Sequence, residues 1–321
     1  MSKYSIAIGS SLFLVLLCAM SMVAAPRDAG TVSVSRTIPS PFNLVRGNFA
    51  EWTGGNLVLI EDRWSASPTL ATFDRDGNQI SKFNFTIPGA GLINIYDHSV
   101  ALGKDGSLAI VGTVYSNDSR GATFVAWVSA DRRYQTLIRL TSFFPHSVIV
   151  PSDGTIWVSG YQKGTELGDR ADNRHQVILR YDRSGKLLGS ISPLSNGPDS
   201  AVVGRGGSQS ILVSSGEDVG WYYPREQAYV EFSLSGSVMH RFEGPQDHHG
   251  VTTLAACTNG NVFVASNKGT DWGIFSLNRE QGDWTFAPKQ EKWGELLGCD
   301  GTSLVAITDF DKISWLETAG N

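Results

Sequence analysis

A glycine-centred hairpin turn recurs six times along this chain and constrains its fold more than any other feature. The second residues of successive turn pairs are 51, 48, 53, 53 and 41 positions apart. The six pairs are Gly54-Gly55, Asp105-Gly106, Asp153-Gly154, Gly206-Gly207, Asn259-Gly260 and Asp300-Gly301. Asp-Gly and Asn-Gly supply the positive φ angles that tight hairpins need. A period of this length indicates a repeat architecture with one supersecondary unit per repeat.

Each repeat has the pattern of four short strands. A small apolar strand precedes the turn pair and a more hydrophobic one follows it, as at 99–102 and 108–114. A third strand ends in a second turn, as at 73–77 and 181–185, and a fourth strand follows. Beyond the first 25 residues no segment carries the apolar stripe of a helix. Six such units predict an all-β fold, a six-bladed β-propeller with four antiparallel strands per blade.

The last repeat is one strand short. Its third strand falls at 313–316, and the sequence ends at Asn321. Residues 31–38 alternate like the outer strands of the other repeats, yet they precede the first repeat. We therefore expect this N-terminal strand to complete the blade formed by residues 294–317. Closing the ring in this way leaves no long unpaired strand edge at the seam.

The first 25 residues have the features of a secretory signal peptide. Lys3 precedes an uncharged run from Tyr4 to Ala25 that contains an aliphatic core and ends in small residues. We expect residues 1–25 to be removed, and residues 26–321 to form one propeller domain without a membrane span. The mature protein would then be periplasmic or extracellular, and we expect it to be a monomer.

Charge excludes nucleic acid as a partner. The chain has 26 basic and 31 acidic residues, a net charge of −5, and no Lys/Arg run able to grip a phosphate backbone. No phosphate-binding loop or dinucleotide fingerprint occurs in its required context, so the sequence identifies no cofactor.

Polar residues gather where the chain leads into the innermost strands. In a propeller these segments lie on the face opposite the Asp-Gly turns and ring the mouth of the central channel. Four of the six histidines fall in or beside them, joined by three aspartates. The candidate ligand-binding residues are Asp97, His98, His146, Asp199, Asp247, His248 and His249. Such a mouth can hold a polar molecule or a transition metal, although Asp and His at these positions also cap strand ends.

The repeats resemble those of six-bladed propellers of the NHL type, through residues 104–112, 152–160 and the turn at 181–185. The resemblance extends over the whole mature chain, rests on turn residues and strand patterning, and implies a fold rather than an activity. Peptidyl-amidating lyases of this type hold zinc with histidines from different blades. His146 and His248 or His249 would match two of those ligands, but Gly47 stands where a third would fall.

Three functions remain open. The favoured one is a non-catalytic binding propeller that recognises a small molecule, a glycan or a protein at the channel mouth. The alternative is an extracytoplasmic metal-dependent hydrolase or lyase acting at the same place. The third is a structural module of a cell-envelope assembly.

Two cysteines, Cys257 and Cys299, remain after removal of the signal peptide. They lie just before the hairpin turns of neighbouring blades, and export would allow them to pair. Their one-residue offset relative to the turns favours side chains that point away from each other. We therefore expect two buried free thiols, with a disulfide as the alternative.

Overall fold

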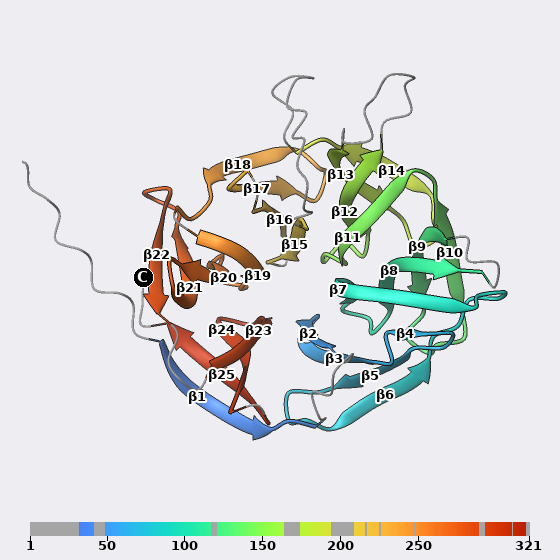
Figure 1. The fold of residues 1–321 in the computed structure, drawn as a ribbon, viewed down its shortest axis with the longest axis horizontal. Helices are drawn as coiled ribbons and strands as arrows, with labels where there is room; N and C mark the ends of the chain where they lie inside the picture. Colours follow the sequence, from blue (N-terminus) through green and yellow to red (C-terminus); the bar gives the residue numbers. More distant parts are fainter. Residues whose placement is uncertain are drawn as a thin grey trace, which may run out of the picture.

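The computed structural model describes residues 32–41, 49–116, 121–163, 174–193, 209–215, 217–224, 226–246, 248–288, 293–309 and 311–318. These residues form strands β1 to β25, which assemble into six antiparallel sheets, and they contain no helix. The sheets stand around a central space as the blades of a propeller (Figure 1). The predicted six-bladed all-β fold is confirmed.

Each blade runs from an inner strand beside the central space to an outer strand at the rim. Blade 1 contains β2 (Phe49–Thr53), β3 (Asn56–Glu61), β5 (Thr69–Phe73) and β6 (Gln79–Asn84). Blade 2 contains β7 (Leu92–Leu102), β8 (Leu108–Tyr115), β9 (Gly121–Val128) and β10 (Gln135–Leu140), and the short β4 (Trp64–Ser65) pairs with β7. Blade 3 contains β11 (Phe143–Ile149), β12 (Ile156–Lys163), β13 (Arg174–Tyr181) and β14 (Leu187–Ile191).

The remaining blades follow the same order. Blade 4 contains β15 (Ile211–Ser214), β16 (Asp218–Tyr223), β17 (Ala228–Ser233) and β18 (Val238–Glu243). Blade 5 contains β19 (His248–Ala256), β20 (Val262–Lys268), β21 (Asp271–Asn278) and β22 (Asp283–Pro288). Blade 6 contains β23 (Trp293–Asp300), β24 (Ser303–Thr308), β25 (Lys312–Thr318) and β1 (Val32–Pro39).

The hydrophobic core is divided among the interfaces between blades. Successive side chains of a strand point to opposite faces of its sheet, so each blade buries residues against both neighbours. In β19, Leu254 belongs to the cluster shared with blade 4, whereas Ala255 belongs to the cluster shared with blade 6. At the seam, Trp52 of blade 1 and Trp315 of blade 6 meet edge to face with ring centroids 5.4 Å apart.

The predicted ring closure is also confirmed. Strand β1 pairs with β25 in an antiparallel ladder that runs from Val32 opposite Thr318 to Pro39 opposite Lys312. The Ser35 hydroxyl donates a hydrogen bond to the carbonyl of Trp315, and the Arg36 guanidinium lies 4.7 Å from the centre of the Trp315 ring. Residues from both ends of the described chain therefore build one blade.

Bulges interrupt several inner strands on the side away from their hairpin turns. In β7 the pairing with β8 shifts between Ile95 and Val100, and in β11 the pairing with β12 shifts between Pro145 and Ser147. Glycine makes room for this irregular backbone, because a Cβ atom at Gly112 would lie 2.3 Å from the carbonyl oxygen of Asn94. The bulge in β7 takes residues 96–99 out of the regular alternation of side chains along the strand, and these residues include part of the candidate site.

The cysteines are paired, so the expectation of free thiols was wrong. Cys257 and Cys299 form a disulfide whose Cα atoms are 5.2 Å apart. Neighbouring blades contact each other through opposite faces of equivalent strands. A one-residue offset therefore turns the two side chains toward each other, whereas the expectation treated it as turning them apart. The pairing of β23 with β24 shifts between Leu296 and Gly298. Cys299 packs against the hydrophobic cluster between blades 5 and 6 that contains Cys257.

Within the described part of the chain, no helix has the length and the apolar character needed to cross a membrane. Residues 1–25, the expected signal peptide, lie outside the described residues.

Candidate functional site

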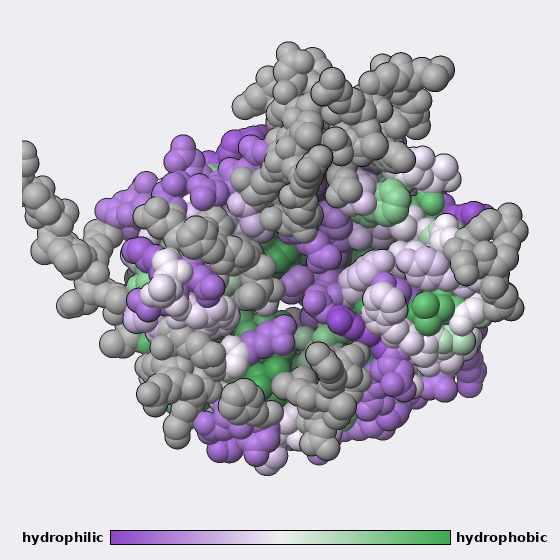
Figure 2. All heavy atoms as spheres, viewed as in Figure 1, coloured by the Kyte–Doolittle hydropathy of each residue, from purple (hydrophilic) through white to green (hydrophobic). Residues whose placement is uncertain are grey.

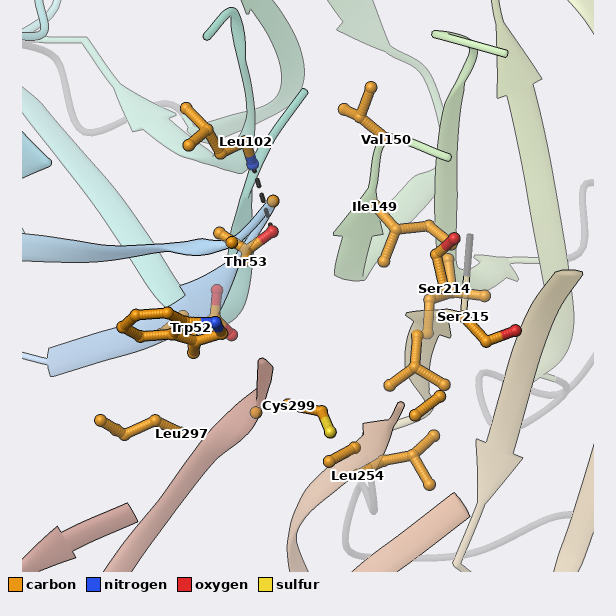
Figure 3. Close-up of a pocket in the computed structure, with 18 of the residues that line it drawn as sticks. Trp52, Thr53, Leu102, Ile149, Val150, Ser214, Ser215, Leu254, Leu297 and Cys299 are labelled. Atoms are coloured by element: carbon orange, nitrogen blue, oxygen red, sulfur yellow. Dashed lines mark hydrogen bonds between the residues drawn. The ribbon is translucent and has the colours of Figure 1, made fainter. Parts of the chain in front are cut away.

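The centre of the ring contains a channel with a volume of about 410 Å³. Its walls come from the inner strands, and Figure 2 shows the hollow in the middle of the molecule with hydrophilic and hydrophobic residues around it. In Figure 3, Leu102, Ile149 and Leu254 lie around the same space on the inner strands of three different blades. Near the hairpin turns the lining includes Lys104, Ser152, Thr258 and Asp300.

A small polar recess adjoins the channel on the side away from the turns. It has a volume of about 10 Å³ and is lined by Phe49, Ala50, Glu51, Asp97, His98, Thr253, Glu295, Leu296 and Leu297. Glu51, His98, Thr253 and Leu297 line both the recess and the channel, so the two spaces are continuous. Four blades contribute to this recess, through β2, β7, β19 and β23.

The bulge in β7 places Asp97 and His98 in the recess. His98 has a positive φ of 61°, a conformation that is uncommon for residues other than glycine and that concentrates at functional sites. Its Nδ1 atom lies 2.8 Å from a carboxylate oxygen of Glu51. Asp97 accepts a hydrogen bond of 2.7 Å from Nη1 of Arg63. Two of the three carboxylates in the recess therefore have a basic partner.

Glu295 is the third carboxylate, and no described residue forms an ion pair with it. Desolvation by burial raises the pKa of Glu295 above its usual value of 4.5. The negative charges of Asp97 and Glu51 raise this pKa further, whereas His98 lowers it. Among the described residues, the recess thus has three carboxylates and two basic partners, His98 and Arg63.

Two buried polar groups in the same region have no hydrogen-bond partner among the described residues. They are the hydroxyl of Thr253, a residue that lines both recess and channel, and the indole Nε1 of Trp52, whose ring packs in the core between blades 1 and 6. Thr253 is 2% exposed and Trp52 is 6% exposed. Leaving such groups unsatisfied costs about 1 to 3 kcal/mol each, so a bound molecule that forms a hydrogen bond with Thr253 would be stabilised.

The structure brings only some of the predicted site residues together. Asp97 and His98 line the recess, but His146 lines neither the recess nor the channel among the described residues. His146 is buried between blades 3 and 4, where its Nδ1 accepts a hydrogen bond of 3.3 Å from the amide of Ser210 and its ring lies against Tyr161. This acceptor role places the proton of a neutral ring on Nε2.

The other four candidate residues lie wholly or partly outside the described part of the structure. His248 and His249 occupy the first positions of β19, but their side chains are outside the described part of the structure. Asp199 and Asp247 are outside it altogether. Among the side chains that are described, no three His, Cys, Asp or Glu residues are arranged to hold a metal ion. The role of these four residues stays a prediction.

Glu51 and Glu295 were missed because the sequence analysis considered the polar residues that lead into the inner strands, whereas these two lie within β2 and β23. In β23 a shift in pairing between Trp293 and Leu296 also moves Glu295 out of the regular alternation. A usable signal was present, since each glutamate interrupts an otherwise apolar inner strand.

The comparisons with known proteins identify the fold and nothing narrower. No protein family and no curated protein matches the sequence. A presumed exported protein from Bacteroides fragilis aligns over 89% of this chain and 95% of its own, with 12% identity and a TM-score of 0.55. A PQQ-bound aldose sugar dehydrogenase from Streptomyces coelicolor aligns over 91% and 99%, with 15% identity and a TM-score of 0.49. At 12% identity the likeness to the Bacteroides fragilis protein shows a shared fold and leaves the function open.

The raised pKa of Glu295 predicts how stability depends on pH. A carboxyl whose pKa is raised by folding stabilises the folded state at low pH, and this contribution is lost as pH rises through the folded-state value. Below pH 4.5 we expect Glu295→Gln to have nearly the same melting temperature as the wild type. At neutral pH we expect the variant to have the higher melting temperature. Part of Glu295 is open to solvent, so screening limits the size of the effect but not its sign.

Thermal melts of both proteins across this pH range measure the difference. Glu51, Asp97, His98 and Arg63 are present in both proteins, so their contributions largely cancel. Glu280→Gln, at an exposed position on blade 5, is the matched control and should show no pH-dependent difference. A difference that grows toward acid pH would contradict the prediction.

Proposed function

We propose that this protein is an exported, non-catalytic binding protein that holds a small polar molecule in the central channel of its propeller. Export rests on the signal peptide expected at residues 1–25, which places the mature protein in a periplasm or outside the cell. The observation that carries the proposal is a channel continuous with a polar recess, where the buried hydroxyl of Thr253 has no partner among the described residues.

The dimensions of the channel support this proposal. Small-molecule sites are typically clefts of about 300 to 1,000 Å³ with apolar walls and a few polar groups that fix orientation. The channel has a volume of about 410 Å³, aliphatic residues along its walls, and polar groups beside the recess and near the hairpin turns. A rigid ring of sheets holds these groups in place before a ligand arrives, which lowers the entropic cost of binding.

The proposal is tested by screening small molecules against the mature protein with ligand-detected NMR and thermal shift. Ala256 lines the channel, and Ala256→Phe should fill part of it. We expect binding to the wild type and a loss of at least tenfold in affinity for Ala256→Phe. Ala130→Phe, at an exposed position after β9, is the control for adding an aromatic ring.

Either of two results would overturn the proposal: absence of any ligand for the wild type, or ligands that bind Ala256→Phe as tightly as the wild type. A stoichiometric transition metal in the purified protein would favour the metal-dependent enzyme instead.

A further inference from the structure

The recess and the channel together point to the chemistry of the ligand. We propose that the site takes an organic cation with one primary ammonium group and an apolar body. The ammonium would occupy the recess bounded by Glu51, Asp97, Thr253 and Glu295, and the body would lie in the channel. This inference rests on the proposed function and specifies its ligand.

The first argument is charge. The recess is lined by three carboxylates, on Glu51, Asp97 and Glu295. His98 and Arg63 are the basic groups that contact this cluster, and they contact Glu51 and Asp97 at 2.8 and 2.7 Å. Glu295 is left without an ion-pair partner among the described residues, in surroundings that disfavour its charge. One added positive charge would relieve both the desolvation of Glu295 and the repulsion between the carboxylates.

The second argument is the Thr253 hydroxyl, which does not belong to the acidic cluster. It is buried, lines the same recess, and has no hydrogen-bond partner in the described part of the chain. An ammonium group is a donor of three hydrogen bonds and accepts none. Carboxylate oxygens and this hydroxyl oxygen provide the acceptors that such a group requires.

The third argument is size. A volume of about 10 Å³ corresponds to a single water-sized group. A primary ammonium has this size, whereas a trimethylammonium or a guanidinium group is larger. Because Leu297 lines both spaces, together with Glu51, His98 and Thr253, a chain attached to the ammonium would pass directly into the channel with its apolar walls.

The test uses four probes with a short unbranched alkyl chain and different head groups: hexan-1-amine, hexan-1-ol, hexanoate and hexyltrimethylammonium. Isothermal titration of the mature protein at neutral pH should give the tightest binding for hexan-1-amine. We expect its affinity to exceed that of hexan-1-ol at least tenfold, because the alcohol lacks the charge. Hexanoate should not bind, and hexyltrimethylammonium should bind at least tenfold more weakly than the amine because of its size.

Variants locate the ammonium. Glu295→Gln should weaken hexan-1-amine binding at least tenfold and leave hexan-1-ol binding unchanged. Thr253→Val keeps the shape of the side chain, removes its hydroxyl, and should weaken amine binding about threefold to tenfold. Glu280→Gln removes an exposed charge on blade 5 and should have no effect. Circular dichroism and thermal melts of each variant confirm that it is folded.

The failure of this inference differs from the failure of the proposed function. If hexan-1-ol and hexan-1-amine bind equally, and both are lost in Ala256→Phe, the channel binds ligands but the ammonium inference is wrong. Binding of Ca²⁺ or Zn²⁺ that is abolished by Glu295→Gln would assign the recess to a metal ion and also overturn it. If hexan-1-amine does not bind the wild type, the inference is wrong whatever the screen finds.

Discussion

Deleting residues 26–39 should lower the melting temperature of the mature protein by about 10 to 20 °C. The deletion removes β1, which pairs with β25 at seven positions. It also exposes the face of blade 6 that Val32 covers, and it removes the guanidinium of Arg36 from the ring of Trp315. Together these losses amount to about 4 to 6 kcal/mol. Domains of this size lose about 2 to 4 °C per kcal/mol.

Two point variants within β1 distinguish its packing from its mere presence. Val32 is 5% exposed and lies in the core between blades 5 and 6, whereas Val34 is 51% exposed. Val32→Asp should destabilise the protein by about 2 to 4 kcal/mol, because it buries an unpaired charge. Val34→Asp should change the stability by less than about 0.5 kcal/mol.

A synthetic peptide of residues 31–39 provides a second readout for the deletion. Added in excess to the shortened protein, it should restore part of the lost stability by pairing with β25. Unchanged melting of the shortened protein would contradict the closure of blade 6 by β1.

Removing the disulfide should produce the second large effect. The bond between Cys257 and Cys299 closes a loop over a separation of 42 residues. In the chain-entropy description, such a cross-link stabilises the folded state by about 4 kcal/mol. We therefore expect the double variant Cys257→Ala, Cys299→Ala to melt about 10 °C below the wild type.

The control for this experiment is dithiothreitol, which should lower the melting temperature of the wild type and leave the double variant unchanged. Mass spectrometry gives an independent readout. The denatured, unreduced mature protein should take up no alkylating label at these two cysteines. Uptake of two labels would show that the bond is absent.

The fold could be predicted from the sequence because its turns follow local rules. Asp-Gly and Asn-Gly pairs mark hairpins through backbone conformation alone, so their period gives the number of blades without any knowledge of packing. The missing strand of the last repeat and the unassigned strand at residues 31–38 were enough to predict the seam.

The disulfide and the site depend on relations between blades, which the sequence does not display. Contacts across a blade interface join opposite faces of equivalent strands. The one-residue offset between Cys257 and Cys299 therefore turns their side chains toward each other, whereas we expected it to turn them apart. Bulges also move residues such as Glu295 relative to any fixed count from a turn. His98 was found because it lies where the chain leads into an innermost strand, whereas Glu51 required knowledge of which strands surround the recess.

The pairing of β1 with β25 has a consequence for the order in which this protein folds. The hydrogen bond between Ser35 and Trp315 joins residues 280 positions apart, so β1 is the first strand to be synthesised and the last to acquire its partner. Contacts of such high sequence separation must overcome a large loop-closure entropy before they contribute energy, and they slow folding. The ring therefore cannot close during synthesis. A chain with this topology reaches its final structure only after its last strand has emerged, so under the proposed export the ring would still be open while the chain is threaded across a membrane.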